Sequence, residues 1–220
     1  MKMWVVFQKG YRLRHIGHLD LLRTMHRALR RSQLPIAFSQ GFNPHVLMNF
    51  AAPLSVGVTG LKEIMEIPLT REMTVEEFEQ KLRQALPEDL VFVSARKVED
   101  NHAAPMALLH SAIYEAKLEN PQGLFESIPS YLKQEHIEEM RKTKSGVKPC
   151  DIRPLIYDIT VLEPDTLCMH VALNDKGTCK PDLLLASLAK FAEVEKPSAK
   201  LIRTQLLGKW QEMPVPLENL

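Results

Sequence analysis

Hydrophobic and polar positions in the first hundred residues predict strands and helices in turn. Apolar residues return every three or four positions between His18 and Ser32, which predicts a helix that ends before Pro35. A second helix should begin after Thr74, because Glu77 stands at the position that a capping box requires. Short apolar or alternating runs predict strands at residues 3–8, 36–38, 46–50, 63–69 and 90–96.

The same order of elements returns in the second half of the chain. Strands are indicated at residues 111–119, 137–143, 152–162, 166–174 and 200–207. Helices are indicated at 122–134, which Pro129 interrupts, and at 183–191 after Pro181. The pattern predicts an α+β protein of two ferredoxin-like βαββαβ halves with antiparallel sheets. We place these halves at residues 1–100 and 106–208, followed by a tail at 209–220.

The composition excludes several classes of protein. With 45% hydrophobic and 25% charged residues, the chain has enough apolar surface to fold and is not a disordered segment. Its apolar runs are shorter than the ~20 residues that a membrane-spanning helix needs. Three cysteines without a CxxC spacing indicate neither a disulfide framework nor a zinc site. We therefore predict a cytoplasmic protein that has no membrane partner.

Positive charge is concentrated near the amino terminus. Residues 1–50 hold eight basic residues and one acid, a net charge of +7, whereas the whole chain carries +1. Arginines at helical spacing share one face of the predicted first helix, and arginine favours bidentate contacts with phosphate. We expect six arginines to hold phosphates: Arg12, Arg14, Arg23, Arg27, Arg30 and Arg31. The alternative is a solvated helix face on which Asp20 pairs with Arg23 or Arg27.

A turn-rich segment follows this helix. Gly41 permits a positive φ, Asn43-Pro44 favours a turn, and Phe42 is expected to anchor the loop by burying its ring. We expect a substrate cleft lined by Gln40, Gly41, Phe42, Asn43 and His45, with His15, His18 and Asp20 on its rim. The alternative is a tight connection between strands whose polar side chains are satisfied locally.

A second basic segment lies beyond residue 140. Its cations, Arg141, Lys142, Lys144 and Lys148, suit either a hairpin that contacts a nucleic-acid backbone or a merely solvated hairpin. Asp151 and Arg153 are two residues apart, so we expect them to share a strand face and to pair with each other or with a neighbouring strand.

Several familiar motifs are missing from the sequence. It contains no P-loop, no GxGxxG fingerprint, no CxxxCxxC and no aromatic RNP stretch. If the chain binds RNA, we therefore expect charge and shape to dominate over stacking on a sheet. No cofactor or metal is assigned to it.

Three runs of residues carry a family resemblance. Residues 14–23 (RHIGHLDLLR), 34–45 (LPIAFSQGFNPH) and 52–57 (APLSVG), with later pieces at 151–154 (DIRP) and 203–204 (RT), closely resemble the radical-SAM-linked protein family of bacteria. Gly17 stands where that family usually has Ser, and Val46-Leu47 replace its usual Pro-Lys. The resemblance implies a domain fused to, or encoded beside, a radical S-adenosylmethionine enzyme, with an RNA- or ribosome-linked role and no established activity.

These observations together predict a non-catalytic accessory protein that binds RNA or presents a substrate to a radical S-adenosylmethionine enzyme. Two alternatives stay open. One is a metal-independent endoribonuclease that uses His15, His18 or His45 as a general base. The other is a protein–protein adaptor that binds no nucleic acid.

Overall fold

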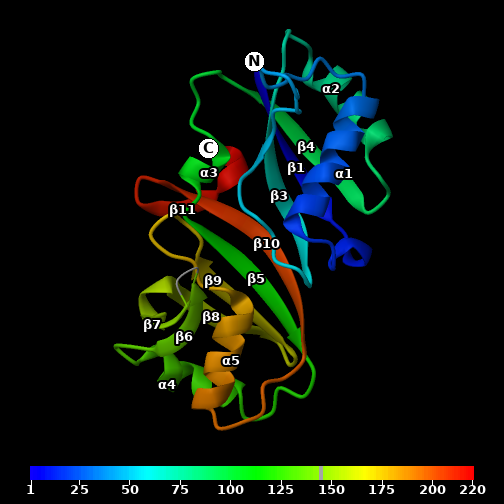
Figure 1. Ribbon diagram of the computed structural model, residues 1–220. Coiled ribbons are helices and arrows are strands. Elements are labelled where there is room, and N and C mark those ends of the chain that lie inside the picture. Colours follow the sequence, from blue (N-terminus) through cyan, green and yellow to red (C-terminus); the bar gives the residue numbers. More distant parts are fainter. Residues whose placement is uncertain (144–145) are drawn as a thin grey trace. The chain divides into compact units, whose positions relative to one another are not determined.

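A computed structural model describes residues 1–143 and 146–220, which form two compact units (Figure 1). Unit 1 comprises Met1–Leu109 and Ile202–Leu220, and unit 2 comprises His110–Leu201. Both mix helices with mostly antiparallel strands. None of the described helices is long and apolar enough to cross a membrane.

The sheet of unit 1 is built around β1 (Lys2–Lys9). Strand β1 is antiparallel to β3 (Val58–Pro68) on one side and to β4 (Leu90–Val98) on the other, so that Val5 faces Met65 and Ala95. The strand order is β4-β1-β3-β10, where β10 spans Ala199–Trp210 and belongs to unit 1 from Ile202 onward. The short strands β2 (Asn49–Phe50) and β11 (Met213–Pro216) pair with β3 and β10.

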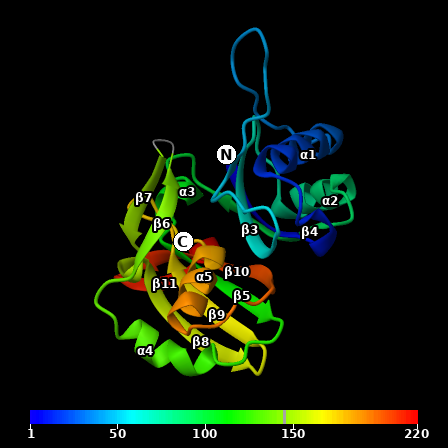
Figure 2. The ribbon, with the colours of Figure 1, turned by 60° about the horizontal axis from the view of Figure 1, so that its bottom comes forward.

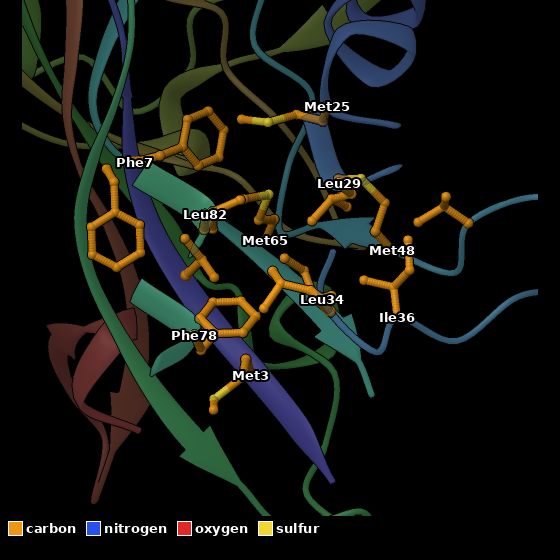
Figure 3. Close-up of a cluster of buried hydrophobic side chains, with 14 of the residues drawn as sticks. Met3, Phe7, Met25, Leu29, Leu34, Ile36, Met48, Met65, Phe78 and Leu82 are labelled. Atoms are coloured by element: carbon orange, nitrogen blue, oxygen red, sulfur yellow. The ribbon is translucent and has the colours of Figure 1, made fainter. Parts of the chain in front are cut away.

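Two helices cover one face of this sheet. They are α1 (His18–Arg31) and α2 (Val75–Ala85), and both were predicted by the periodicity. The Thr74 hydroxyl accepts the Glu77 amide at 3.1 Å, which confirms the predicted cap. Their apolar side chains meet those of the strands in one buried cluster (Figure 3), to which Met3, Phe7, Met25, Leu29, Met65, Phe78 and Leu82 contribute. Three further short helices lie in unit 1, namely η1 (Tyr11–Leu13), α3 (Pro105–Leu108) and η4 (Leu217–Asn219).

Unit 2 has three antiparallel strands in the order β5-β9-β8, with bounds Ser111–Leu118, Thr166–Ala172 and Ile156–Glu163. Helix α5 (Pro181–Phe191) supplies the buried residues Leu184, Leu185 and Leu188. Tyr131, on the short helix α4 (Ile128–Leu132), donates its buried hydroxyl to Ser187 Oγ at 2.9 Å. A separate hairpin joins β6 (Glu138–Thr143) to β7 (Gly146–Asp151).

The structure departs from the predicted elements at several places. Residues 36–38 form only isolated bridges, and residues 146–151 form β7, where no strand was predicted. The helix expected at 122–134 is reduced to η2 (Phe125–Ser127) and α4, because Pro129 cannot donate a backbone hydrogen bond. The strand expected at 152–162 begins as the helical turn η3 (Arg153–Leu155), which contains Pro154. The run at 46–50 is a strand only at its last two residues.

The end of the chain also differs from the expected boundaries. Residues 202–220, which the sequence assigned to the second half and a tail, belong to unit 1. Leu206, Leu207 and Leu217 are buried there, and β11 pairs back on β10. Burial of these leucines gives this segment a reason to fold with unit 1.

Candidate nucleic-acid-binding surface

Helix α1 separates apolar from cationic side chains. Leu21, Met25 and Leu29 point into the core, whereas four arginines are exposed on the outer side. We call this set the arginine face: Arg23, Arg27, Arg30 and Arg31. It follows from the spacing of these residues along a helix whose other side is needed for packing.

Members of the arginine face differ in their partners. Arg23 Nη1 lies 3.0 Å from Asp20 Oδ1, which is the pair that the solvated-face alternative expected. Arg27 donates to Thr24 Oγ1 at 3.3 Å, and Arg31 donates to the Ala85 carbonyl at 2.9 Å. Among the described residues, no carboxylate forms an ion pair with Arg27, Arg30 or Arg31. These three cations are therefore the ones left without a compensating charge.

The two arginines that precede α1 already have local partners. Arg12 Nη2 lies 3.0 Å from Glu88 Oε2 and its Nε lies 2.8 Å from Asp89 Oδ2. These carboxylates raise the pKa of Arg12, first through the hydrogen bond of Asp89. Arg14 stacks on the Tyr11 ring at 3.6 Å and donates to the Tyr11 carbonyl at 2.9 Å. Of the six arginines of the predicted patch, Arg12 and Arg23 are thus paired with carboxylates, and Arg14 lies against its neighbour Tyr11.

A loop projects from unit 1 directly after α1, as Figure 2 shows. Its stem is closed by a bridge between Phe38 and Val46 and by the Ser39 amide, which donates to the His45 carbonyl at 2.9 Å. The His45 amide donates to Ser39 Oγ at 3.0 Å, and His45 Nδ1 lies 2.7 Å from the same oxygen. Ser39 and His45 therefore hold the two strands of the stem together.

The tip of this loop does not have the predicted anchor. Phe42 is 105% exposed, so the expectation that its ring is buried was wrong. Gly41 adopts φ +119° with open space around it, as its predicted role requires. Gln40 and Asn43 are also exposed, so the loop offers its side chains to solvent on a projecting arm.

The histidines are distributed differently from the predicted rim. His18 packs its ring against Phe50 at 5.6 Å, and its Nδ1 is buried without a partner among the described residues. His15 is exposed. His26, which the sequence did not single out, has its pKa lowered by burial, then by His45 and by Arg30.

The stem and the arginine face are in direct contact. Arg30 Cζ lies 5.9 Å from the centre of the Phe38 ring. The base of the loop therefore adjoins the arginine face at Arg30. No local pattern indicated this contact, because Phe38 looked like part of an ordinary apolar run.

The basic residues of the second half are less concentrated. Arg141, half-buried on β6, stands opposite exposed Lys148 on β7. Lys144 lies outside the described residues, and Lys142 is placed by its backbone alone. The hairpin predicted here exists, and its role in nucleic-acid binding stays a prediction.

Asp151 and Arg153 have structural partners. Asp151 Oδ1 accepts the amides of Ile137 and Arg153, each at 2.9 Å, and Oδ2 lies 2.8 Å from His136 Nδ1. The Arg153 guanidinium instead donates to main-chain carbonyls, including that of Leu132 at 2.8 Å. Of the two predicted alternatives, pairing between the two side chains is not found among the described residues, because residue 153 lies in a helical turn and not on a strand face. Asp151 instead bonds to His136 and Ile137, directly before strand β6.

A buried charged cluster, which the sequence did not indicate as such, lies in unit 1. Arg203 makes a two-point ion pair with Glu63, with its Nε 2.9 Å from Oε1 and its Nη2 2.5 Å from Oε2. The same guanidinium donates to the carbonyls of Ala52 and Pro53, both at 3.2 Å. Lys9 lies nearby and donates to the Ile16 carbonyl at 3.2 Å, and burial lowers its pKa. This cluster holds together the two motif segments at 52–57 and 203–204.

A family model matches residues 2–181, and its description is "Uncharacterized protein conserved in bacteria (DUF2344)". No curated protein matches the chain.

Proposed function

The chain belongs to this bacterial family, and we propose that it binds RNA through the arginine face of α1 and the neighbouring loop. The single observation that carries the proposal is the group Arg27, Arg30 and Arg31, which are exposed and have no carboxylate partner among the described residues. A packed helix holds these like charges close together, and an anion on this surface reduces their repulsion. A phosphate backbone supplies such anions in a row.

The electrostatics of the chain favour a polyanion over a single small anion. Negative charge is distributed over residues 51–220, and two of these acids already neutralise Arg12. Arg27, Arg30 and Arg31, which form no ion pair with a carboxylate among the described residues, all lie on the outer side of one helix. Guanidinium groups bind phosphate oxygens through two parallel hydrogen bonds, which suits several successive phosphates.

Salt dependence tests the proposal. If three arginines each neutralise one phosphate of a single strand, log K should fall with log salt at a slope of about −2, from roughly −0.7 per contact. The double variant Arg27→Gln/Arg30→Gln should lower the affinity and bring the slope to about −0.7. Fluorescence anisotropy of a labelled RNA oligonucleotide in a KCl series measures both quantities.

Arg12→Gln is the matched control, because Glu88 and Asp89 already compensate this arginine. It removes one formal charge and is compared with the single variant Arg27→Gln, so an equal loss of affinity in these two variants would contradict a specific role for the arginine face. Absence of RNA binding at low salt would overturn the proposal itself.

The same preparation separates the two alternatives. RNA cleaved in EDTA, with activity lost in His45→Ala, would favour the endoribonuclease. A protein complex that survives nuclease treatment but is lost in Arg27→Glu would favour the adaptor. Intact RNA that remains bound is the result that the proposed function expects.

We further propose that the chain serves a radical S-adenosylmethionine enzyme and that unit 1 has a ferredoxin-like fold. The first part is supported by the motif resemblance at residues 14–57, and the second by the order β4-β1-β3 with β2 beside β3. Failure of the chain to co-purify with a radical S-adenosylmethionine enzyme from its own cell would remove the first part. An experimental structure of unit 1 would test the second.

A further inference from the structure

The side chain of Phe42 buries no apolar surface in the folded protein. Its side chain is 105% exposed at the tip of the projecting loop, between polar Gln40 and Asn43. A phenyl ring normally contributes to stability by leaving water, and this one stays in water. A single exposed apolar side chain is common on protein surfaces, and what sets Phe42 apart is the ordered stem that carries it and the cations beside that stem.

The loop holds this ring on a prepared stem. Three hydrogen bonds between Ser39 and His45 close its base, one from the Ser39 amide at 2.9 Å, one from the His45 amide at 3.0 Å and one between their side chains at 2.7 Å. Pro44 further restricts the chain beside the tip. Because the stem is already ordered, contact through Phe42 costs less conformational entropy than contact through a free chain.

The ring lies within reach of the arginine face. The stem residue Phe38 contacts Arg30, with 5.9 Å from the ring centre to Cζ. Phe42 follows Phe38 by four residues, which span at most about 14 Å when extended. One strand of nucleic acid can therefore contact the cations of α1 and the aromatic tip together. An aromatic ring beside a row of cations is the combination that binds single strands, in which bases are free to stack.

We propose that Phe42 stacks on an unpaired base of a single-stranded RNA whose phosphates lie along the arginine face. The inference rests on the proposed RNA binding and adds the class of RNA. A duplex keeps its bases inside the helix and offers the ring no face to stack on. The protein should accordingly prefer single strands, with little dependence on sequence, because every base has an aromatic face.

Substitutions at position 42 test the stacking. Phe42→Ala should weaken binding to a single-stranded RNA by about 5-fold to 150-fold and leave binding to a duplex of the same length unchanged. Phe42→Trp should retain the affinity, whereas Phe42→Leu should behave like Phe42→Ala. If Phe42→Leu binds as tightly as the wild type, the tip needs only an apolar side chain and stacking is overturned.

Fluorescence gives a second readout that does not depend on affinity. A variant with Phe42→Trp and Trp210→Phe leaves one exposed tryptophan at the tip, since Trp4 is only 1% exposed. Single-stranded RNA should quench its emission, and duplex should not. Unchanged emission on saturation with single-stranded RNA would overturn the proposal.

The failures of the two proposals are distinguishable. If Arg27→Gln/Arg30→Gln weakens binding and Phe42→Ala does not, RNA binding stands and base stacking falls. If the wild type binds no RNA at low salt, both fall together.

Discussion

At the scale of single residues, this chain uses arginine in two opposite ways. Arg153 and Arg203 point inward and donate to main-chain carbonyls, whereas Arg27 and Arg30 point outward. A buried guanidinium has five donors to satisfy, so it organises the loops whose carbonyls surround it. Residue type therefore does not tell which arginines are used inside the fold and which point into solvent.

Asp151 should make the free energy of unfolding of unit 2 depend on pH. Two amides and His136 stabilise its charged form and lower its pKa from 3.8 to about 2, with the Ile137 amide contributing most. A lowered pKa in the folded state adds stability above pH 4 that is lost as the pH falls through 2. The difference in unfolding free energy between wild type and Asp151→Asn should therefore be largest above pH 4.

Urea unfolding of both proteins across pH 2 to 7 checks this expectation. His136→Ala serves as the control, because it removes one partner of the carboxylate and leaves both amides in place. A difference between wild type and Asp151→Asn that stays constant over this range would contradict the role assigned to the carboxylate.

At the scale of elements, the two long helices of unit 1 begin differently. Helix α2 starts at Thr74, whose hydroxyl accepts the Glu77 amide at 3.1 Å, whereas α1 starts at Gly17 without a side-chain cap. Helix α1 is held instead by its buried side, which includes Met25 and Leu29. Helix α1 thus depends on packing more than α2 does.

Substitution of Thr74 should show how much the cap of α2 contributes to the free energy of unfolding. Thr74→Ala should lower the free energy of unfolding by about 1 kcal/mol, because one amide at the helix start loses its acceptor. Thr74→Ser keeps the hydroxyl and should stay close to the wild type. Thermal or urea unfolding followed by circular dichroism compares the three proteins, and equal stability of Thr74→Ala and wild type would show that the cap contributes nothing.

At the scale of the whole molecule, the end of the chain is tied into unit 1 by buried charges. Arg203 and Glu63 are 140 residues apart, and their side chains are only 1% and 4% exposed. Together they join β10, β3 and the segment at residues 52–53. Such a pair contributes little net energy when intact, but it is costly to break because the remaining charge is buried alone.

Glu63→Gln should destabilise unit 1 by about 3–5 kcal/mol, because Arg203 then keeps a buried charge without a counterion. A double variant with Glu63→Leu and Arg203→Met should recover part of this loss, since neither charge is left buried. Urea unfolding measures the stability of both variants.

Glu88→Gln, which removes an exposed partner of Arg12, is the control and should leave the free energy of unfolding nearly unchanged. If Glu63→Gln lowers the free energy of unfolding only slightly, water reaches the cluster and the charge of Arg203 is not buried alone.

Part of the candidate surface could be predicted from the sequence. The spacing of Arg23, Arg27, Arg30 and Arg31 placed them on one face of a helix, and α1 confirms this arrangement. The exposure of Phe42 could not be predicted in this way, because the same letters suit a buried anchor or a projecting tip. Nor could the neutralisation of Arg12, which depends on Glu88 and Asp89 from a distant part of the chain.

What the sequence determined by itself is local: the helices α1 and α2, the alternating strands, and the gathering of positive charge before residue 50. These follow from periodicity, capping and proline, which act over a few neighbouring residues. Only the tertiary structure decided which cations keep an open charge, which ring stays in water, and that Arg203 belongs inside unit 1. Those outcomes depend on pairings between residues far apart in the chain, and no local pattern contains them.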